Sequence, residues 1–201
     1  MEFERIQFEK AAGLWREWNG KINVVSRKDI DNLFDHHIIH SLAIAEYLTR
    51  LLQSEPGEIQ DSFLDVGTGG GFPGIPLAMV LPNSSFTLCD SIGKKVKVAG
   101  AVAEGLGLEN VRTANCRAEQ LPGEFDWIVS RAVTSLENFY PWVRGKYRKG
   151  ILYLKGGDVM DEISAMCSKF RLKESKIHVW EINEWLKDDY FKEKFVIHIE
   201  K

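Results

Sequence analysis

The sequence predicts an α/β protein built on a doubly wound sheet of seven strands, most of them parallel. Three observations predict this fold. Short apolar segments typical of buried strands alternate with helical segments from residue 63 onward. A glycine-rich turn follows the first of these strands, where an α/β sheet usually binds a ligand. Two further strand-like segments end the chain with no helix between them, which indicates an antiparallel pair.

The part of the chain before this alternation is expected to be helical. Apolar residues recur there at helical spacing, and they predict helices over residues 3–18 and 31–52. Pro56 and Gly57 then mark a junction, because this pair favours a turn. The sequence therefore predicts an N-terminal helical extension over residues 1–56 and a main α/β domain over residues 57–201.

The main domain is expected to contain five parallel strands with helical crossovers on both faces of the sheet. The expected strands cover residues 63–66, 86–89, 111–114, 127–130 and 151–154. The expected helices cover residues 75–81, 94–106, 136–147 and 159–170. The last two strands, over residues 176–182 and 194–200, complete a seven-stranded sheet that ends in an antiparallel hairpin.

Composition excludes several classes of protein. Of the 201 residues, 44% are hydrophobic and 27% are charged, which is typical of a globular domain rather than a disordered chain. The longest apolar run is far shorter than the roughly 20 residues that cross a bilayer. The first residues also lack the pattern of a signal peptide. The three cysteines form no C-x-x-C motif. We therefore expect a soluble cytoplasmic protein.

Basic residues gather in parts of a chain whose formal net charge is −3. Nucleic-acid-binding proteins are usually basic, so the average charge does not indicate one. Charge runs are most often solvated faces. On charge alone, a solvated face and a nucleic-acid-binding face both stay open. The basic residues expected near the carboxyl edge of the sheet or just before its fifth strand are Lys94, Lys95, Arg117, Arg131, Arg144, Lys146, Arg148, Lys149 and Lys155.

The turn after the first strand is where the chemistry is expected. Residues 65–74 read D-V-G-T-G-G-G-F-P-G, so the backbone can approach a ligand closely. Gly69, Gly71 and Gly74 also satisfy the G-x-G-x-x-G pattern of dinucleotide-binding proteins. Asp90 ends the second strand, where a carboxylate would accept both ribose hydroxyls of a nucleoside. Three interpretations remain: S-adenosylmethionine, a dinucleotide, or a purely structural turn.

Asp65 favours the first of these ligands. It lies two residues before Gly67, where the pyrophosphate of a dinucleotide would approach the turn. A carboxylate there repels phosphates but attracts S-adenosylmethionine, which has no phosphate and carries a sulfonium and an ammonium group. The pattern of Asp65, Gly67 and Gly69, followed by Asp90, therefore predicts an S-adenosylmethionine site.

Four stretches of the sequence resemble a known family over nearly the whole chain. They are Gly71-Phe72-Pro73-Gly74-Ile75-Pro76-Leu77, Arg117-Ala118-Glu119, Ser130-Arg131-Ala132 and Leu154-Lys155-Gly156. They closely resemble the glucose-inhibited division protein B family, the bacterial small-subunit ribosomal RNA guanine-N7 methyltransferases. The resemblance implies a class I S-adenosylmethionine-dependent methyltransferase fold, Rossmann-like, with 16S ribosomal RNA as substrate.

The resemblance also implies roles for single residues. Gly67 and Phe72 match positions that line the methionine and adenosine parts of the cofactor, and Ala118 and Glu119 match the pair that holds the adenine. Arg131 matches the arginine after the fourth strand, and we expect it to be catalytic and to border the cofactor. The expected cofactor site comprises Gly67, Phe72, Ala118, Glu119, Arg131, Asp65, Gly69 and Asp90, and the expected RNA contacts are Arg117 and Lys155.

The implied reaction needs few catalytic groups from the protein. N7 of guanine has a lone pair and no proton to remove, so catalysis is mostly positioning and needs no general base. After the fourth strand the sequence lacks both the Asn/Asp-Pro-Pro-Tyr motif of amine methylation and a nucleophilic cysteine. Arg131 is expected to orient the guanine through O6 or to hold a neighbouring phosphate. Two alternatives stay open: a dinucleotide-dependent oxidoreductase and a ribosome-assembly factor without catalytic activity.

Three histidines precede the junction. His36 and His40 have the i, i+4 spacing of metal ligands, but no further cluster completes a site, so we expect no metal. His37 is expected to pack or hydrogen-bond against the glycine-rich turn. The expected partner is 16S ribosomal RNA, within the small ribosomal subunit or an assembly intermediate, and no membrane.

Overall fold

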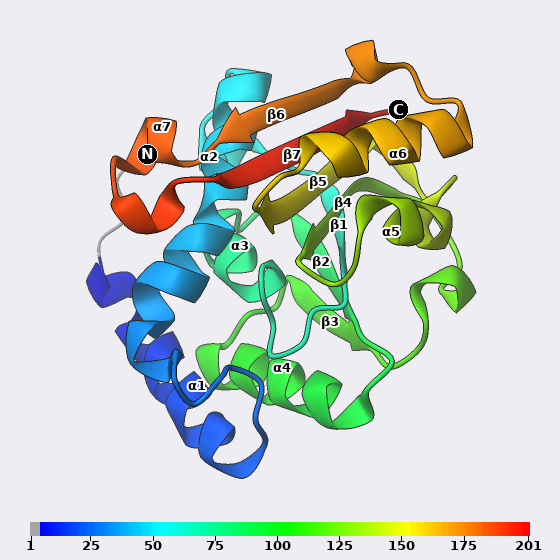
Figure 1. Ribbon diagram of the computed structural model, residues 1–201. Coiled ribbons are helices and arrows are strands. Elements are labelled where there is room, and N and C mark those ends of the chain that lie inside the picture. Colours follow the sequence, from blue (N-terminus) through cyan, green and yellow to red (C-terminus); the bar gives the residue numbers. More distant parts are fainter. Residues whose placement is uncertain (1–4) are drawn as a thin grey trace.

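Residues 5–201 are described by the computed structural model, so the start of the helix expected over 3–18 lies outside it. Seven strands form one sheet in the order β3-β2-β1-β4-β5-β7-β6 (Figure 1). The strands are β1 (Ser62–Val66), β2 (Ser85–Cys89), β3 (Val111–Ala114), β4 (Phe125–Arg131), β5 (Tyr147–Gly156), β6 (Ile177–Glu181) and β7 (Lys194–Glu200). The first five strands pair in parallel, and β7 pairs antiparallel with both β5 and β6. The predicted fold class is confirmed.

Helices cover both faces of this sheet. The helices are α1 (Glu9–Lys21), α2 (His40–Leu52), α3 (Gly74–Val80), α4 (Gly93–Leu106), α5 (Leu136–Val143), α6 (Met160–Phe170) and the short α7 (Asn183–Leu186). Buried residues of α1 to α4 join one hydrophobic cluster with one face of the sheet. Those of α5 and α6 join a second cluster with the other face. Among the described residues, no helix has the length and apolar character needed to span a bilayer.

The strands β1, β4 and β5 alternate between these two clusters. In β1, Phe63 belongs to the first cluster, whereas Leu64 and Val66 belong to the second. Successive side chains of a strand point to opposite faces, so a central strand covered on both faces has apolar residues at nearly every position. Asp65 is the exception among the four buried residues of β1, and it is fully buried.

The helices before residue 57 pack onto the rest of the molecule. Helix α1 packs against α4, and α2 packs against α3, as Figure 1 shows beside the sheet. Trp15 of α1 and Leu42 of α2 are fully buried in the same cluster as Phe63 of the sheet. The division into residues 1–56 and 57–201 therefore stays a prediction, since one core serves both parts.

Two predicted helices have different bounds in the structure. The helix expected over 136–147 ends at Val143, because Gly145 turns the chain with a φ of +79° and Tyr147 already pairs with Phe125 in the sheet. The helix expected over 31–52 is α2 preceded by a wider π-helical segment, Leu33–Ile39. That segment presents His36 and His37 beside the sheet.

Candidate functional site

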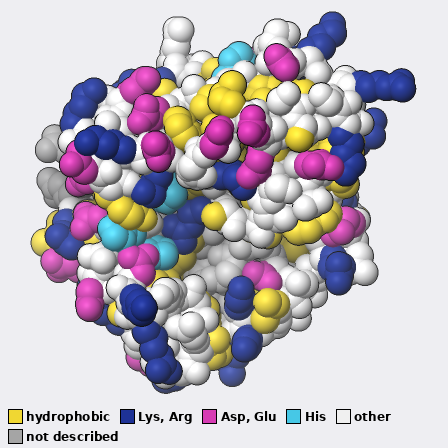
Figure 2. All heavy atoms as spheres, viewed as in Figure 1, with side chains coloured by type: hydrophobic (Ala, Val, Ile, Leu, Met, Phe, Trp, Pro, Cys, Tyr) yellow, Lys and Arg dark blue, Asp and Glu magenta, His cyan; other side chains and the backbone are white. Residues whose placement is uncertain are grey.

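A cavity of about 400 Å³ lies at the carboxyl edge of the sheet. It is formed by the ends of β1, β2 and β4, the segment after β3 and the start of α4. The strand order reverses between β1 and β4, which is where open α/β sheets bind ligands. The volume is typical of small-molecule sites. The face drawn in Figure 2 is hollowed near its middle, and histidine, lysine and arginine side chains border the hollow.

Gly67 begins the turn and lines the cavity. Its φ is +71°, and a Cβ at this position would lie 2.5 Å from Cγ2 of Val133. A side chain is therefore excluded for two reasons, the left-handed backbone and the close approach of the loop after β4. Gly69 also has a positive φ, +56°, and its N–H donates to Oδ2 of Asp90 at 3.0 Å.

Asp90 is held in place by two backbone groups. Oδ1 accepts from the N–H of Ile92 at 2.9 Å, and Oδ2 accepts from Gly69. The carboxylate lines the cavity and is mostly buried. Each carboxylate oxygen has a second lone pair, so Asp90 can still accept hydrogen bonds from a ligand. Asp90 thus follows β2 and lines the cavity, and its contact with a ribose stays a prediction.

Asp65 does not line the cavity, in contrast to the expected contact with a ligand. Its side chain points toward α3, where Oδ2 accepts from Oγ1 of Thr68 at 2.6 Å and from the N–H of Gly74 at 2.9 Å. Burial raises the pKa of Asp65 to about 7, against these two hydrogen bonds. The reason for the difference is strand alternation: Val66 faces the cavity, so Asp65 faces away. Asp65 shapes the turn from behind.

Phe72 also supports the site from behind. It is 4% exposed and stacks on Trp15 of α1, with ring centroids 4.3 Å apart. The Trp15 indole N–H donates to the carbonyl of Gly70 at 2.7 Å, so α1 braces the turn. The guanidinium carbon of Arg131 lies 5.0 Å from the centre of the Phe72 ring. Phe72 therefore contacts Arg131, which lines the cavity, and is not itself among the lining residues.

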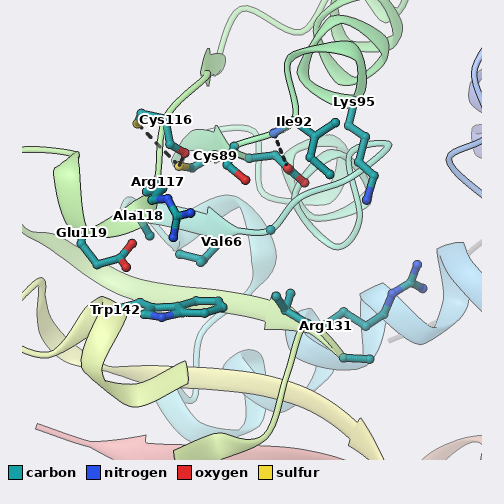
Figure 3. A pocket seen from close by; sticks show the side chains of 15 residues that line it. Val66, Cys89, Ile92, Lys95, Cys116, Arg117, Ala118, Glu119, Arg131 and Trp142 are labelled. Carbon is teal, nitrogen blue, oxygen red and sulfur yellow. Dashed lines mark hydrogen bonds between the residues drawn. The ribbon is translucent and has the colours of Figure 1, made fainter. Parts of the chain in front are cut away.

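One end of the cavity is formed by the segment after β3. Figure 3 shows Ala118, Glu119 and Trp142 together at this end. Ala118 is buried, whereas the Glu119 carboxylate and the Arg117 side chain are exposed. This end offers an apolar surface, an aromatic ring and a carboxylate, which suit a nucleobase with an exocyclic amine.

Arg131 lies at the other end of the cavity. Figure 3 shows its side chain extending away from Trp142, on the side where Lys95 lies. Its Nη2 donates to Nδ1 of His37 at 2.8 Å. Burial lowers the pKa of Arg131 to about 10, so the guanidinium remains charged at neutral pH. His37 also lies 5.4 Å from the Phe72 ring, and the expected packing of His37 near the glycine-rich turn is observed.

Lys155 does not line the cavity. Its Nζ donates to the carbonyl of Thr134 at 3.2 Å and pairs with Glu162 at 2.9 Å. The Tyr153 hydroxyl accepts from the N–H groups of Val133 and Thr134, at 3.0 and 3.1 Å. Both side chains of β5 thus brace the loop that carries Val133 against Gly67. Contact of Lys155 with RNA stays a prediction.

Four of the basic residues named in the sequence analysis lie at the edge of the sheet opposite the cavity. They follow α5 and begin β5, whose amino end is far from the carboxyl ends that form the cavity. Lys149 Nζ pairs with Oδ1 of Asp61 at 2.6 Å, and Arg148 Nε pairs with Oδ1 of Asp126 at 3.0 Å. The residues concerned are Arg144, Lys146, Arg148 and Lys149.

Sequence reasoning missed two contributors to the site. Trp142 lines the cavity although it belongs to α5, and only its aromatic character could have suggested it. Asp29 accepts from both His36 and His37, and no local pattern in the sequence indicates this. The contacts of Asp29 span only seven and eight residues, and the fold of the intervening segment brings these side chains together.

The chain is similar to known proteins over most of its length. A family model described as GidB, rRNA small subunit methyltransferase G, matches residues 6–186. A Porphyromonas gingivalis protein named Ribosomal RNA small subunit methyltransferase G is 50% identical over 98% of this chain and 87% of its own length. A Christiangramia forsetii protein with the same name is 48% identical over 96% of this chain and 88% of its own length.

Solved structures share the fold at low sequence identity. A Synechocystis magnesium protoporphyrin IX methyltransferase with bound SAM has a TM-score of 0.61 and 13% identity, over 98% of this chain and 95% of its own. A T. thermophilus 16S rRNA N2 methyltransferase in complex with AdoMet and guanosine has a TM-score of 0.59 and 19% identity, over 81% of this chain and 43% of its own. These similarities support the fold alone.

Proposed function

Because this chain belongs to the GidB family, rRNA small subunit methyltransferase G, we propose that it methylates N7 of a guanine in 16S ribosomal RNA. It is an S-adenosylmethionine-dependent methyltransferase, and neither alternative, a dinucleotide oxidoreductase or a non-catalytic assembly factor, is favoured. The observation that carries the choice of N7 is the cavity itself, which ends at a half-buried guanidinium rather than at a general base.

The residues of the cavity fit the cofactor. Asp90 keeps free lone pairs beside the turn, where they suit two ribose hydroxyls. Glu119 can accept from the exocyclic amine of an adenine, with Ala118 and Trp142 as apolar neighbours. Gly67 lines the cavity and offers its backbone to the methionine part of the cofactor. S-adenosylmethionine supplies a methyl group that is already activated by a positively charged sulfur.

The chemistry that remains for the protein is positioning. Among the described residues that line the cavity, the carboxylates are Asp90 and Glu119. Both oxygens of Asp90 accept backbone N–H groups, and Glu119 lies at the opposite end from Arg131 (Figure 3). We assign Asp90 to the ribose and Glu119 to the adenine, and neither to a general base beside Arg131. A nucleophile without a proton, such as guanine N7, fits such a site.

Cysteine chemistry is also disfavoured. Cys89 lines the cavity, but burial raises the pKa of its thiol to about 12, so little thiolate is present at neutral pH. Attack on C6 of a pyrimidine requires a thiolate nucleophile. Arg131 is instead the group that we propose to contact the target guanine, through O6 or an adjacent phosphate.

We further propose that the substrate RNA is presented within the small ribosomal subunit or an assembly intermediate, in the cytoplasm. Lys95 and Arg117 border the cavity, and no ion pair joins either to another residue within 5–201. They can therefore contact phosphates beside the target base. A base in folded RNA would have to leave its stack to reach the cavity.

Methyl-labelled S-adenosylmethionine tests this function. The protein is incubated with unmodified small subunits and, separately, with RNA extracted from them. Label in RNA that becomes cleavable after borohydride and aniline treatment is the expected result, because that chemistry detects guanine N7 methylation. Label that resists this cleavage would place the methyl elsewhere and overturn the choice of N7. Label in neither substrate, with cofactor binding confirmed by calorimetry, would overturn the substrate.

A further inference from the structure

We propose that His37 and Asp29 are positioning residues that hold the Arg131 guanidinium at the reacting end of the cavity. This inference rests on the proposed function, since it assigns Arg131 a task in methyl transfer. All three side chains come from different segments: Asp29 precedes the π-helical segment, His37 lies within it, and Arg131 ends β4.

The three side chains form a continuous chain of hydrogen bonds. Oδ2 of Asp29 lies 2.6 Å from Nε2 of His37, and Nδ1 of His37 lies 2.8 Å from Nη2 of Arg131. The other oxygen of Asp29 lies 2.5 Å from Nδ1 of His36, so a second imidazole fixes the carboxylate. The His36 ring in turn stacks on Tyr190, with centroids 3.5 Å apart.

This geometry determines the tautomer of His37. A guanidinium has only donors, so Nδ1 of His37 must be the acceptor and carry no hydrogen. Nε2 then carries the hydrogen and donates to Asp29. His37 is therefore neutral, and Asp29 selects the tautomer that can accept from Arg131. Burial and the neighbouring Arg131 cation lower the pKa of His37 to about 4, in agreement with this assignment.

The Asp29 carboxylate is also kept ionised, which is the form that the hydrogen bonds to His37 and Arg131 require. Although burial opposes it, hydrogen bonds from His36 and His37 hold the pKa of Asp29 below its usual value. Asp29 thus remains an acceptor at neutral pH. The arrangement links a carboxylate to a guanidinium through a neutral imidazole, so that Arg131 keeps its full positive charge without a direct ion pair.

The contacts restrict Arg131 without using all of its donors. Phe72 lies against the guanidinium, His37 accepts from Nη2, and the His36 carbonyl lies 3.4 Å from Nη1. A guanidinium has five N–H donors, so these two acceptors within the described residues leave three for a ligand. A direct ion pair with a carboxylate would instead have occupied a bidentate edge of the guanidinium.

The tautomer can be measured directly on the whole protein. Nitrogen-15 NMR of labelled protein near pH 7 distinguishes imidazole Nδ1–H, Nε2–H and the protonated ring, and His37→Gln assigns the His37 signals. We expect the Nε2–H form. An Nδ1–H or protonated His37 would overturn the proposal. This measurement needs no substrate, so it remains informative if the proposed function itself fails.

Two substitutions at His37 separate its two hydrogen bonds. In His37→Asn the side-chain oxygen can occupy the place of Nδ1 and keep the bond to Arg131. In His37→Gln the side-chain nitrogen can occupy the place of Nε2 and keep only the bond to Asp29. We expect His37→Gln to lower kcat by on the order of 100-fold, as a misplaced catalytic group does. His37→Asn should lose no more than about tenfold.

Two controls accompany these variants: the affinity for the cofactor product, and a substitution at a remote histidine. S-adenosylhomocysteine should bind both variants with wild-type affinity, because neither substitution reaches Asp90 or Glu119. His178→Gln changes an exposed histidine that is bonded to Glu200, 2.7 Å away, and should leave kcat unchanged. Equal losses in His37→Asn and His37→Gln, or wild-type kcat in His37→Gln, would overturn the proposal. If the wild-type protein methylates no RNA, the proposed function has failed and the NMR result alone decides.

Discussion

The two edges of the sheet carry the same kinds of side chains and differ in how those side chains are paired. At the amino edge, Lys149 and Arg148 meet the carboxylates of Asp61 and Asp126 within 3.0 Å. At the carboxyl edge, Arg131 meets a neutral histidine instead, and Lys95 and Arg117 border an open cavity. A basic residue therefore indicates a ligand site only where the fold leaves its charge uncompensated.

Two glycines, one at each edge of the sheet, also differ in what surrounds them. Gly67 at the carboxyl edge and Gly145 near the amino edge both have positive φ, +71° and +79°. A Cβ on Gly67 would collide with Val133, whereas a Cβ on Gly145 would meet nothing within 4 Å. The amino edge uses glycine only to turn the chain. The carboxyl edge also uses it to let the loop after β4 pack closely against the turn beside the cavity.

The largest effect is expected from removing the Arg131 charge at the carboxyl edge. Arg131→Met should lower kcat for RNA methylation by about 100- to 1000-fold, because a preorganised cationic donor is lost. Although Arg131 was expected to border the cofactor, we now assign it to the target guanine. Cofactor affinity should therefore change by no more than about threefold. Arg148→Met, at the amino edge, should leave kcat unchanged. A normal rate in Arg131→Met would show that the two edges do not differ in catalysis.

The next effect is expected from the glycines. Gly67→Ala should lower the free energy of unfolding by about 2 kcal/mol or more, because left-handed backbone costs about 1–2 kcal/mol and the contact with Val133 adds to it. Gly145→Ala should lose only about 1 kcal/mol, the backbone cost alone. Urea unfolding of both variants measures this difference. Equal losses of unfolding free energy in the two variants would mean that the close contact of Val133 with Gly67 adds no cost to the substitution.

A smaller effect is expected from the carboxylate at the other end of the cavity. Glu119→Gln should weaken cofactor binding about tenfold, because one acceptor of a charge-assisted hydrogen bond becomes an amide. Glu124→Gln changes an exposed carboxylate just before β4, at the amino edge, and serves as the matched control. Calorimetric titration with S-adenosylhomocysteine measures both. Unchanged affinity in Glu119→Gln would remove this residue from the proposed adenine contact.

The smallest effect is expected from the exposed basic residues. Arg117→Gln should reduce the slope of log affinity for RNA against log salt by about 0.7 to 0.9, which corresponds to one phosphate contact. Lys149→Gln should leave that slope unchanged and lower the unfolding free energy by no more than about 1 kcal/mol, as surface ion pairs do. Filter binding at several salt concentrations tests the pair. A smaller slope in Lys149→Gln, with the slope unchanged in Arg117→Gln, would place the RNA-contacting face at the amino edge.

Most of the fold could be predicted because its signals are local. The strands β1, β2 and β4 and the centre of β5 are apolar runs, and the turn with Gly67 and Gly69 is recognisable from its composition. The predicted helix over 136–147 was too long, because its apolar pattern continues past Val143 into residues that pair in the sheet. Helical spacing alone does not distinguish the last turn of a helix from the first residues of a strand.

The site could be predicted only where one segment defines it. Asp90 was recognised because it follows a strand whose carboxyl end lies beside the glycine-rich turn, and Arg131 was recognised because its stretch resembles the family. The direction of Asp65 was missed although it follows from alternation, since Leu64 and Val66 face one cluster and Asp65 the other side. The contacts of His37 depend on the packing of two distant segments, which no local pattern encodes.

The bond between Trp15 and Gly70 spans 55 residues, and the bond between His37 and Arg131 spans 94. Each joins the stretch before residue 57 to the stretch after it. Recombination that exchanged the first stretch for that of a diverged relative would separate partners that fit each other. The two stretches are therefore inherited most safely together, and a chimaeric gene would need matched changes at both positions of each pair.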